Sequence, residues 1–145
     1  MHKSLELIDQ KFLSDLKLIL KNPIGVDKFL KKRTRVIDKA LSKKFTGYGL
    51  SSRYILCSIG GYGREELFPA SDIDLTIIDQ DPKKKPDEKL NNFVSWLWDQ
   101  NFKVGHSVRS INAMQKLAKN DLQEYTSLLS LRVLSGSKKN ITTFN

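Results

Sequence analysis

Residues 58–75 have the sequence SIGGYGREELFPASDIDL, and this stretch decides how the rest of the chain is interpreted. It joins two expected strands: residues 54–59 are almost continuously apolar, which is typical of a strand buried on both faces, and residues 73–78 form the second strand. Between the two strands lie a glycine pair at positions 60–61 and a segment at 64–67 that we expect to form a short helix before the proline. The order strand, glycine turn, short helix, strand predicts that the glycines and the acids after them meet at one edge of a small sheet.

The glycine pair is suited to binding phosphate. Gly60 and Gly61 carry no side chain that would keep an oxyanion away from their backbone N–H groups. A helix that begins at the pair adds partial positive charge at the same place. A glycine pair alone is more often a simple turn, so the chemical inference depends on the acids that follow.

Two carboxylates follow the glycine pair at a characteristic spacing. Ten residues separate Gly61 from Asp72, and Asp74 lies two positions further on. Side chains two positions apart on a strand point to the same face, about 7 Å apart, and two carboxylates held in this way repel each other unless a cation lies between them. Hard oxygen ligands favour Mg²⁺, which completes its shell with water and substrate phosphates. The combination predicts nucleotide chemistry with Asp72 and Asp74 as metal ligands.

The remaining sequence predicts an α/β (α+β) fold, a small mixed sheet with flanking helices and an N-terminal helical extension. Apolar spacing assigns the other elements: helices at 5–19, 26–41 and 90–101, a third strand at 102–109, a helix capped by Ser110, and a last helix capped by Asn120 or Asp121 and closed by Gly136. We divide the chain into an extension at 1–46, a core at 47–136 and a loose tail at 137–145. We expect the helices to pack on one side of the sheet.

The charge balance indicates an anionic partner. The 145 residues include 25 basic and 16 acidic side chains, a net charge of +9. Such an excess attracts nucleotides, nucleic acids or acidic protein surfaces, although a solvated face that includes Lys31, Lys32 and Arg35 would give the same count. The aromatic residues fall on helix stripes and in the core, and no zinc-finger spacing occurs, which argues against nucleic acid as the partner.

Other features of the composition favour the cytoplasm. No apolar run reaches the roughly 18 residues of a membrane helix. The N-terminal sequence has acids where a signal peptide would have an apolar core. The single cysteine, Cys57, has no partner within the chain for a disulfide. We therefore expect a cytoplasmic protein without membrane contact.

The pattern Gly-Gly, ten residues, Asp-x-Asp resembles the signature of the polymerase-beta-like nucleotidyltransferase superfamily. The longer string GGYGREELFPASDIDL is similar to the N-terminal domain of the protein-PII uridylyltransferase/uridylyl-removing enzymes. The strings WLWD at 96–99, VGHSVR at 104–109 and TSLL with LR within 121–136 are similar to that family in order and spacing. The resemblance covers residues 26–136.

The resemblance implies an Mg²⁺-dependent enzyme that transfers UMP from UTP to a tyrosine of the PII signal protein and releases pyrophosphate. It implies that Gly60 and Gly61 hold the triphosphate and that Asp72 and Asp74 bind the metal. UTP and the PII protein are then the partners of the chain, in a role in nitrogen regulation.

Four further residues are candidates on the same basis. Ser71 either orients the phosphates or only caps the turn. Arg64 either contacts a phosphate or pairs with a neighbouring acid, and Arg109 is a candidate to neutralise the triphosphate from the end of its strand. Most superfamily members carry a third carboxylate on a neighbouring strand, but residues 102–109 contain no acid. His106 is therefore considered as a base or as a packed histidine, and the base stays unassigned.

The resemblance also implies a longer protein. Enzymes of this family add a metal-dependent phosphohydrolase domain that removes UMP and C-terminal domains that sense glutamine. This chain has no room for them, so we expect a fragment of a multidomain protein, with a stand-alone relative as the alternative. Two other functions compete: a nucleotidyltransferase with another acceptor, such as a small alcohol, an RNA or a protein, and a catalytically inactive domain that binds nucleotide or nucleic acid. The motif contacts only the triphosphate, which UTP and ATP share, so it does not indicate which base is bound.

Overall fold

The computed structural model describes residues 5, 8, 10, 12, 13, 15, 21, 23–100 and 102–137 of the chain. Its elements in chain order are α2 (Pro23–Gly47), the 3-10 turn η1 (Leu50–Ser52), β1 (Tyr54–Ser58), α3 (Gly60–Gly63), β2 (Ile73–Asp79), α4 (Glu88–Trp98), β3 (Val104–Arg109), α5 (Ile111–Asn120), α6 (Leu122–Leu128) and β4 (Arg132–Ser135). The expected mixed α/β class is confirmed. None of the helices in this described part is both long and apolar enough to cross a membrane.

The centre of the fold is a four-stranded sheet in the order β3-β2-β1-β4. Strand β1 pairs antiparallel with both β2 and β4, whereas β2 pairs parallel with β3. The glycine turn follows β1, and Asp72 and Asp74 lie directly before and within the first residues of β2, so the antiparallel pairing brings turn and aspartates to the same end of the sheet.

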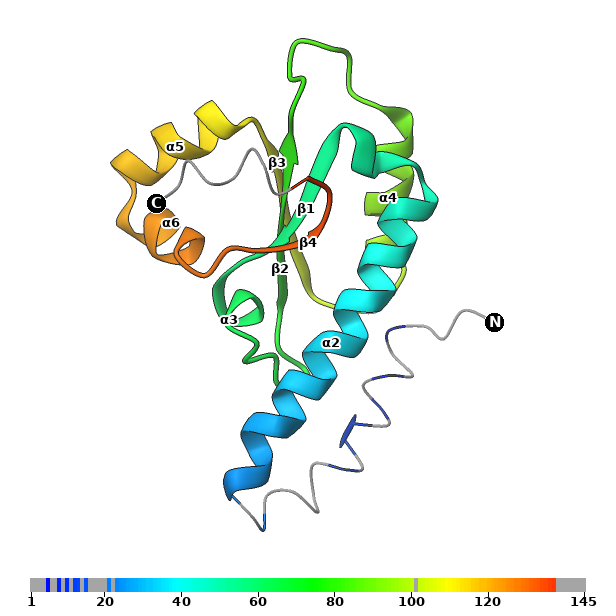
Figure 1. Ribbon diagram of the computed structural model, residues 1–145, viewed down its shortest axis with the longest axis vertical. Helices are drawn as coiled ribbons and strands as arrows, with labels where there is room; N and C mark the ends of the chain where they lie inside the picture. Colours follow the sequence, from blue (N-terminus) through cyan, green and yellow to red (C-terminus); the bar gives the residue numbers. More distant parts are fainter. Residues whose placement is uncertain are drawn as a thin grey trace.

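Helices cover both faces of the sheet, so the expectation of helices on one side is wrong. Figure 1 shows α2 and α4 on one side of the strands and α5 and α6 on the other. Strand β1 explains this arrangement, because Tyr54 and Leu56 contribute to the main core, while Ile55 and Cys57 contribute to a second, smaller core with Met114 of α5. A strand that is apolar on both faces requires cover on both.

Helix α2 is the long support of the main core. It begins at Pro23, a residue favoured in the first turn of a helix, and runs to Gly47, further at both ends than the predicted 26–41. Most of the predicted first helix lies outside the described residues. Leu5, Ile8 and Phe12 of that segment are helical and buried in the same core.

The segment at 64–67 is not the predicted short helix. The helix α3 is instead a single turn formed by the glycines themselves, in which Gly63 N donates to Ile59 O and Arg64 N donates to Gly60 O. Glu65 has a left-handed φ of 61°, which a right-handed helix cannot accommodate. The chain therefore turns away after Arg64 and reaches β2 without further helix.

The predicted last helix is too long. Helix α6 ends at Leu128, and the following residues form β4, in which Arg132 pairs with Ser58. Three apolar residues of the predicted helical stripe are exposed instead of buried: Leu122, Tyr125 and Leu129. Pairing with β1 gives the end of this segment hydrogen bonds and burial that a continued helix would not provide.

Both predicted N-caps of the last two helices are confirmed. Ser110 Oγ accepts a hydrogen bond from Ala113 N at 3.2 Å at the start of α5. Asp121 Oδ1 accepts one from Gln123 N at 2.9 Å at the start of α6. These contacts satisfy backbone donors that helix geometry leaves without partners, and the predicted tail beyond residue 137 lies outside the described residues.

Candidate active site

The glycine turn is joined directly to the strand that carries the aspartates. Ile59 is in the extended conformation before α3, and its N–H donates to Asp74 O at 3.1 Å. The helix then begins at Gly60 and Gly61, whose N–H groups lie at its N-terminal end and have no intrahelical acceptor. The turn therefore presents backbone donors next to the first residues of β2.

The carboxylate of Asp74 lies against Gly60. Gly60 has a left-handed φ of 60°, and a Cβ atom placed on it would lie 3.6 Å from Asp74 Oδ2. Glycine therefore serves the left-handed backbone conformation at this position, and the turn lies within van der Waals range of the carboxylate. The structure thus brings the predicted phosphate turn and one predicted metal ligand together.

The second aspartate is close enough to act on the first. Asp74 is half-buried on β2, whereas Asp72 is exposed one residue before the strand. Burial raises the pKa of Asp74 above its ordinary value, and the negative charge of Asp72 raises it further. Two carboxylates that repel each other in this way fit a divalent cation, which would relieve the repulsion.

The donor set fits a metal with few protein ligands. Among the residues that the structure describes, no group of three or more His, Cys, Asp or Glu side chains could hold a metal ion. Asp72 and Asp74 offer hard oxygen donors only. Such a pair suits Mg²⁺, which keeps waters and takes further ligands from phosphates.

Gly105 is a residue of the site that the sequence analysis missed. It pairs with Asp74 across β2 and β3, and a Cβ atom placed on it would lie 2.8 Å from Asp74 Oδ1. Only glycine leaves room for the carboxylate in this position. A glycine inside a predicted strand is a signal of close approach by another group, and this signal was available in the sequence.

His106 is not placed with the aspartates. It pairs with Leu75, whose side chain belongs to the main core on the α2 and α4 side of the sheet. Because side chains alternate along a strand, His106 faces away from Asp74, and its ring lies 5.7 Å from that of Trp98. This position favours the packed histidine over the base.

Arg64 is placed beside the glycine turn. Its Nη2 atom lies 3.8 Å from the position of a Cβ on Gly61, while its Nε donates to Glu66 Oε2 at 3.0 Å. The ion pair is half-exposed on both side chains. Both hypotheses for Arg64, a phosphate contact and a local ion pair, are therefore compatible with its position.

Ser71 and Arg109 differ in their distance from the pair of aspartates. Ser71 immediately precedes Asp72, and its N–H donates to Phe68 O at 3.0 Å in a turn. Arg109 is four residues along β3 from the partner of Asp74, about 13 Å at the rise of a strand. Arg109 donates to Glu124 Oε2 of α6 at 3.3 Å. Its partner in the structure is therefore this carboxylate, and its position does not favour the predicted contact with the triphosphate.

A second missed residue is Arg132, the first residue of β4. Its guanidinium contacts the carbonyl groups of Tyr62 and Gly63 at the end of the glycine turn. The string LRVLSG at 131–136 is a short apolar run closed by glycine, which is a strand signal. The helical spacing of residues 122–133 obscured that signal.

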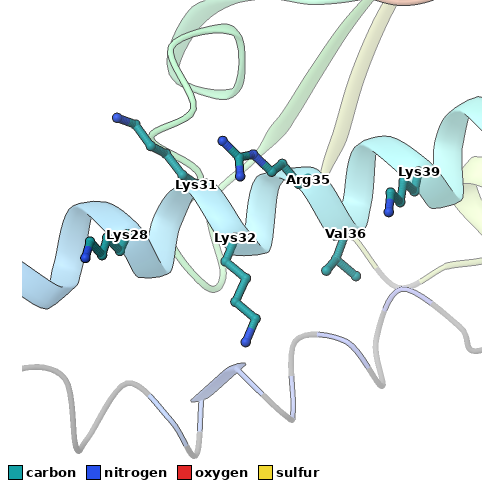
Figure 2. A pocket seen from close by; sticks show the side chains of 6 residues that line it. All are labelled: Lys28, Lys31, Lys32, Arg35, Val36 and Lys39. Carbon is teal, nitrogen blue, oxygen red and sulfur yellow. The ribbon is translucent and has the colours of Figure 1, made fainter.

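Two surface hollows lie along α2 and away from the aspartates. One has a volume of about 390 Å³ and is lined by Lys28, Lys31, Lys32, Arg35, Val36 and Lys39. Figure 2 shows Lys31 and Arg35 projecting from one side of α2 and Lys32 from the other. The basic side chains are exposed, and Lys31 pairs with Asp27 at 3.1 Å. The second hollow is lined by α2 and Leu134 of β4.

Comparison with known proteins gives several relatives of one kind. The bifunctional uridylyltransferase/uridylyl-removing enzyme of Haemophilus influenzae (strain PittEE) is 33% identical over 141 residues, 95% of this chain. The enzymes of the same name from Pseudoalteromonas translucida and Cupriavidus metallidurans are 40% identical over 81% of the chain and 38% identical over 78%. The chain spans 16%, 14% and 13% of the length of these three relatives. No protein-family profile matches the chain.

Proposed function

This chain belongs, over most of its length, to the family of the bifunctional uridylyltransferase/uridylyl-removing enzymes, and on that premise we propose that it is their nucleotidyltransferase unit. The proposed reaction transfers UMP from UTP to a tyrosine hydroxyl of the PII nitrogen-regulatory protein. The hydroxyl oxygen bonds to the α-phosphorus, the bond from that phosphorus to the bridging oxygen breaks, and pyrophosphate and a proton are released.

Residues at the two ends of the segment 60–74 have different roles in this reaction: those at its start bind the triphosphate and those at its end bind the metal. Gly60 and Gly61 offer backbone N–H groups to the triphosphate at the start of α3. Arg64 lies next to Gly61, where its positive charge can approach the same phosphates. Asp72 and Asp74 would hold Mg²⁺ opposite the turn. When bound, Mg²⁺ supplies positive charge that stabilises the triphosphate and the charge that develops on transfer.

The observation that carries the proposal is the contact between the aspartate and the glycine turn. The position of a Cβ on Gly60 is 3.6 Å from Asp74 Oδ2, so the turn and the carboxylate are immediate neighbours. Asp72 adds a second negative charge within interaction range of Asp74. Backbone N–H groups that can bind phosphate and carboxylates that can bind a metal ion then lie at one edge of the sheet, and both kinds of group stabilise charge in phosphoryl chemistry.

The test is a transfer assay with the 145-residue chain, UTP labelled at the α-phosphate, Mg²⁺ and purified PII protein. We expect label on PII and release of pyrophosphate. ATP labelled in the same way is the control for base preference. Preferential transfer of AMP would contradict the uridylyl assignment. Absence of turnover with every acceptor, combined with salt-dependent binding to RNA, would favour an inactive nucleic-acid-binding domain.

The first prediction concerns the two aspartates. Asp72→Asn and Asp74→Asn remove negative charge without changing side-chain size, so we expect at least a hundredfold loss of transfer, in the range that electrostatic groups contribute to catalysis. The circular dichroism spectrum and the unfolding midpoint should change little, because neither side chain is buried in the apolar core. Full activity in Asp74→Asn would contradict the metal role.

A further inference from the structure

Arg132 of β4 holds the end of the glycine turn. Its Nη2 donates to Tyr62 O at 3.2 Å, and its Nε donates to Gly63 O at 3.3 Å. Carbonyl groups at the C-terminal end of a helix carry partial negative charge, so a guanidinium there is favourable. Strand β4 thereby contacts the end of α3 opposite to Gly60 and Gly61.

The same guanidinium is anchored to α2. Arg132 Nη1 forms a short ion pair with Asp38 Oδ2, and Nη2 donates to Asp38 Oδ1 at 3.2 Å. Tyr62 OH donates to that same Oδ1 at 2.7 Å, and the Tyr62 side chain is buried. Arg132, Asp38 and Tyr62 therefore form a closed set of contacts, the clamp, that joins α2, α3 and β4.

Close packing at Gly63 is an independent sign that this part of the chain positions the turn. A Cβ atom placed on Gly63 would lie 2.1 Å from Ser130 O, so only glycine allows the approach. Ser130 lies two residues before Arg132. The turn is thus pressed against the segment that leads into β4 as well as being held by Arg132.

A helix of four residues needs such support. An isolated single turn is unstable, because nucleation fixes several dihedral angles for very few hydrogen bonds. The direction of the N–H groups of Gly60 and Gly61 must therefore come from tertiary contacts. The clamp supplies two of these contacts, the hydrogen bonds from Arg132 to Tyr62 O and Gly63 O at the other end of α3.

We propose that Arg132 is a positioning residue for the triphosphate site: by holding Tyr62 O and Gly63 O against Asp38, it aims the backbone donors of Gly60 and Gly61 at the phosphates. The ligand in this statement rests on the proposed function. The clamp itself is a property of the fold and is tested separately.

The test compares the 145-residue chain with its Arg132→Lys variant. Lysine keeps the charge but lacks the planar fork that contacts Asp38 and two carbonyls at once. We expect amide hydrogen exchange of Gly63, Arg64 and Glu66, whose N–H groups are bonded within the turn, to become about tenfold faster. We also expect the dissociation constant for UTP with Mg²⁺ to rise about tenfold.

Arg53→Lys is the matched control. Arg53 also forms a two-point pair with an aspartate, Asp79, at 2.9 and 2.8 Å, and donates to Lys85 O at 2.8 Å. It lies before β1, at the end of the strand away from the glycine turn. We expect this variant to weaken the fold while leaving UTP affinity and exchange in the turn unchanged.

The outcomes separate the clamp from the proposed function. Unchanged amide exchange in Arg132→Lys would show that the clamp does not hold the glycine turn, whether or not the chain binds UTP. Faster exchange with unchanged UTP affinity, in a chain that binds UTP, overturns the positioning role. If the wild-type chain binds no UTP, the proposed function fails and exchange alone decides the clamp. Should Arg132→Lys not fold, Asp38→Asn is measured under the same criteria, with effects in the same direction expected.

Discussion

At the scale of single residues, Asp74 is confined between two glycines. Positions for a Cβ on Gly60 and on Gly105 lie 3.6 Å and 2.8 Å from its two carboxylate oxygens. The spacing of the glycine pair and Asp74 in the sequence predicted that they would approach each other. The role of Gly105 could not be derived in the same way, because it depends on the register between β2 and β3.

The second prediction follows from this confinement. Gly105→Ala places a methyl group 2.8 Å from Asp74 Oδ1, too close for the present position of the carboxylate, which must rotate away. We expect at least tenfold slower uridylyl transfer and a change in unfolding free energy of less than about 1 kcal/mol, because the end of a side chain moves easily.

Gly47→Ala is the control for this variant. A Cβ atom on Gly47 would meet nothing within 4 Å, so activity should stay at the wild-type level. Equal activity in Gly105→Ala and Gly47→Ala would show that the position of Asp74 between the glycines is irrelevant to transfer.

At the scale of elements, β1 and β2 are joined at their outer ends by Arg53 and Asp79. Burial alone raises the pKa of Asp79, but hydrogen bonds from Arg53 and from Asp81 N bring the pKa below its ordinary value. A carboxyl group with a lower pKa in the folded state contributes stability that is complete above its unfolded pKa, about 4. This contribution is lost as the pH falls through the folded pKa.

The third prediction is therefore an acid dependence. Asp79→Asn should be less stable than the wild type at pH 7, and the difference should shrink as the pH falls below about 4. Urea unfolding at a series of pH values measures it. Asp27→Asn is the control, since Asp27 forms only an exposed pair with Lys31 and should change stability little. A difference that stays constant down to pH 2 would contradict the prediction.

The type and bounds of some elements could be predicted from the sequence, and those of others could not. Strands β1 and β2 are short segments rich in apolar residues, and their predicted bounds differ little from those observed. The segment after α6 was ambiguous, because its apolar residues fit both a helix and a short strand. Pairing with β1, which is distant in sequence, decides for the strand.

At the scale of the whole molecule, the main core provides most of the burial. Phe93 of α4 is fully buried at its centre, with ring centroids 5.1 Å from Phe45 and 5.9 Å from Trp96. The apolar pattern of β1 already indicated burial on both faces. It could not indicate which helices would cover the second face, because that depends on packing between distant parts of the chain, such as Met114 of α5 against Ile55 and Cys57.

The fourth prediction measures this core. Phe93→Ala should lower the free energy of unfolding by about 3–5 kcal/mol, since it removes a ring from a site with little freedom to collapse. Urea denaturation is the measurement. Leu122→Ala, at a side chain that is 80% exposed, should change stability by less than about 0.5 kcal/mol. Equal effects of the two changes would contradict the position of Phe93 in the core.

The contacts of β4 also bear on how the chain matures during synthesis. Gly60 and Arg132 are separated by 71 intervening positions, so the glycine turn leaves the ribosome long before Arg132 does. Translation proceeds at about 5–20 residues per second, and a domain generally folds as a unit. For several seconds the nascent turn therefore lacks the guanidinium that holds it, and on the proposed function UTP binding can begin only after β4 has joined the sheet.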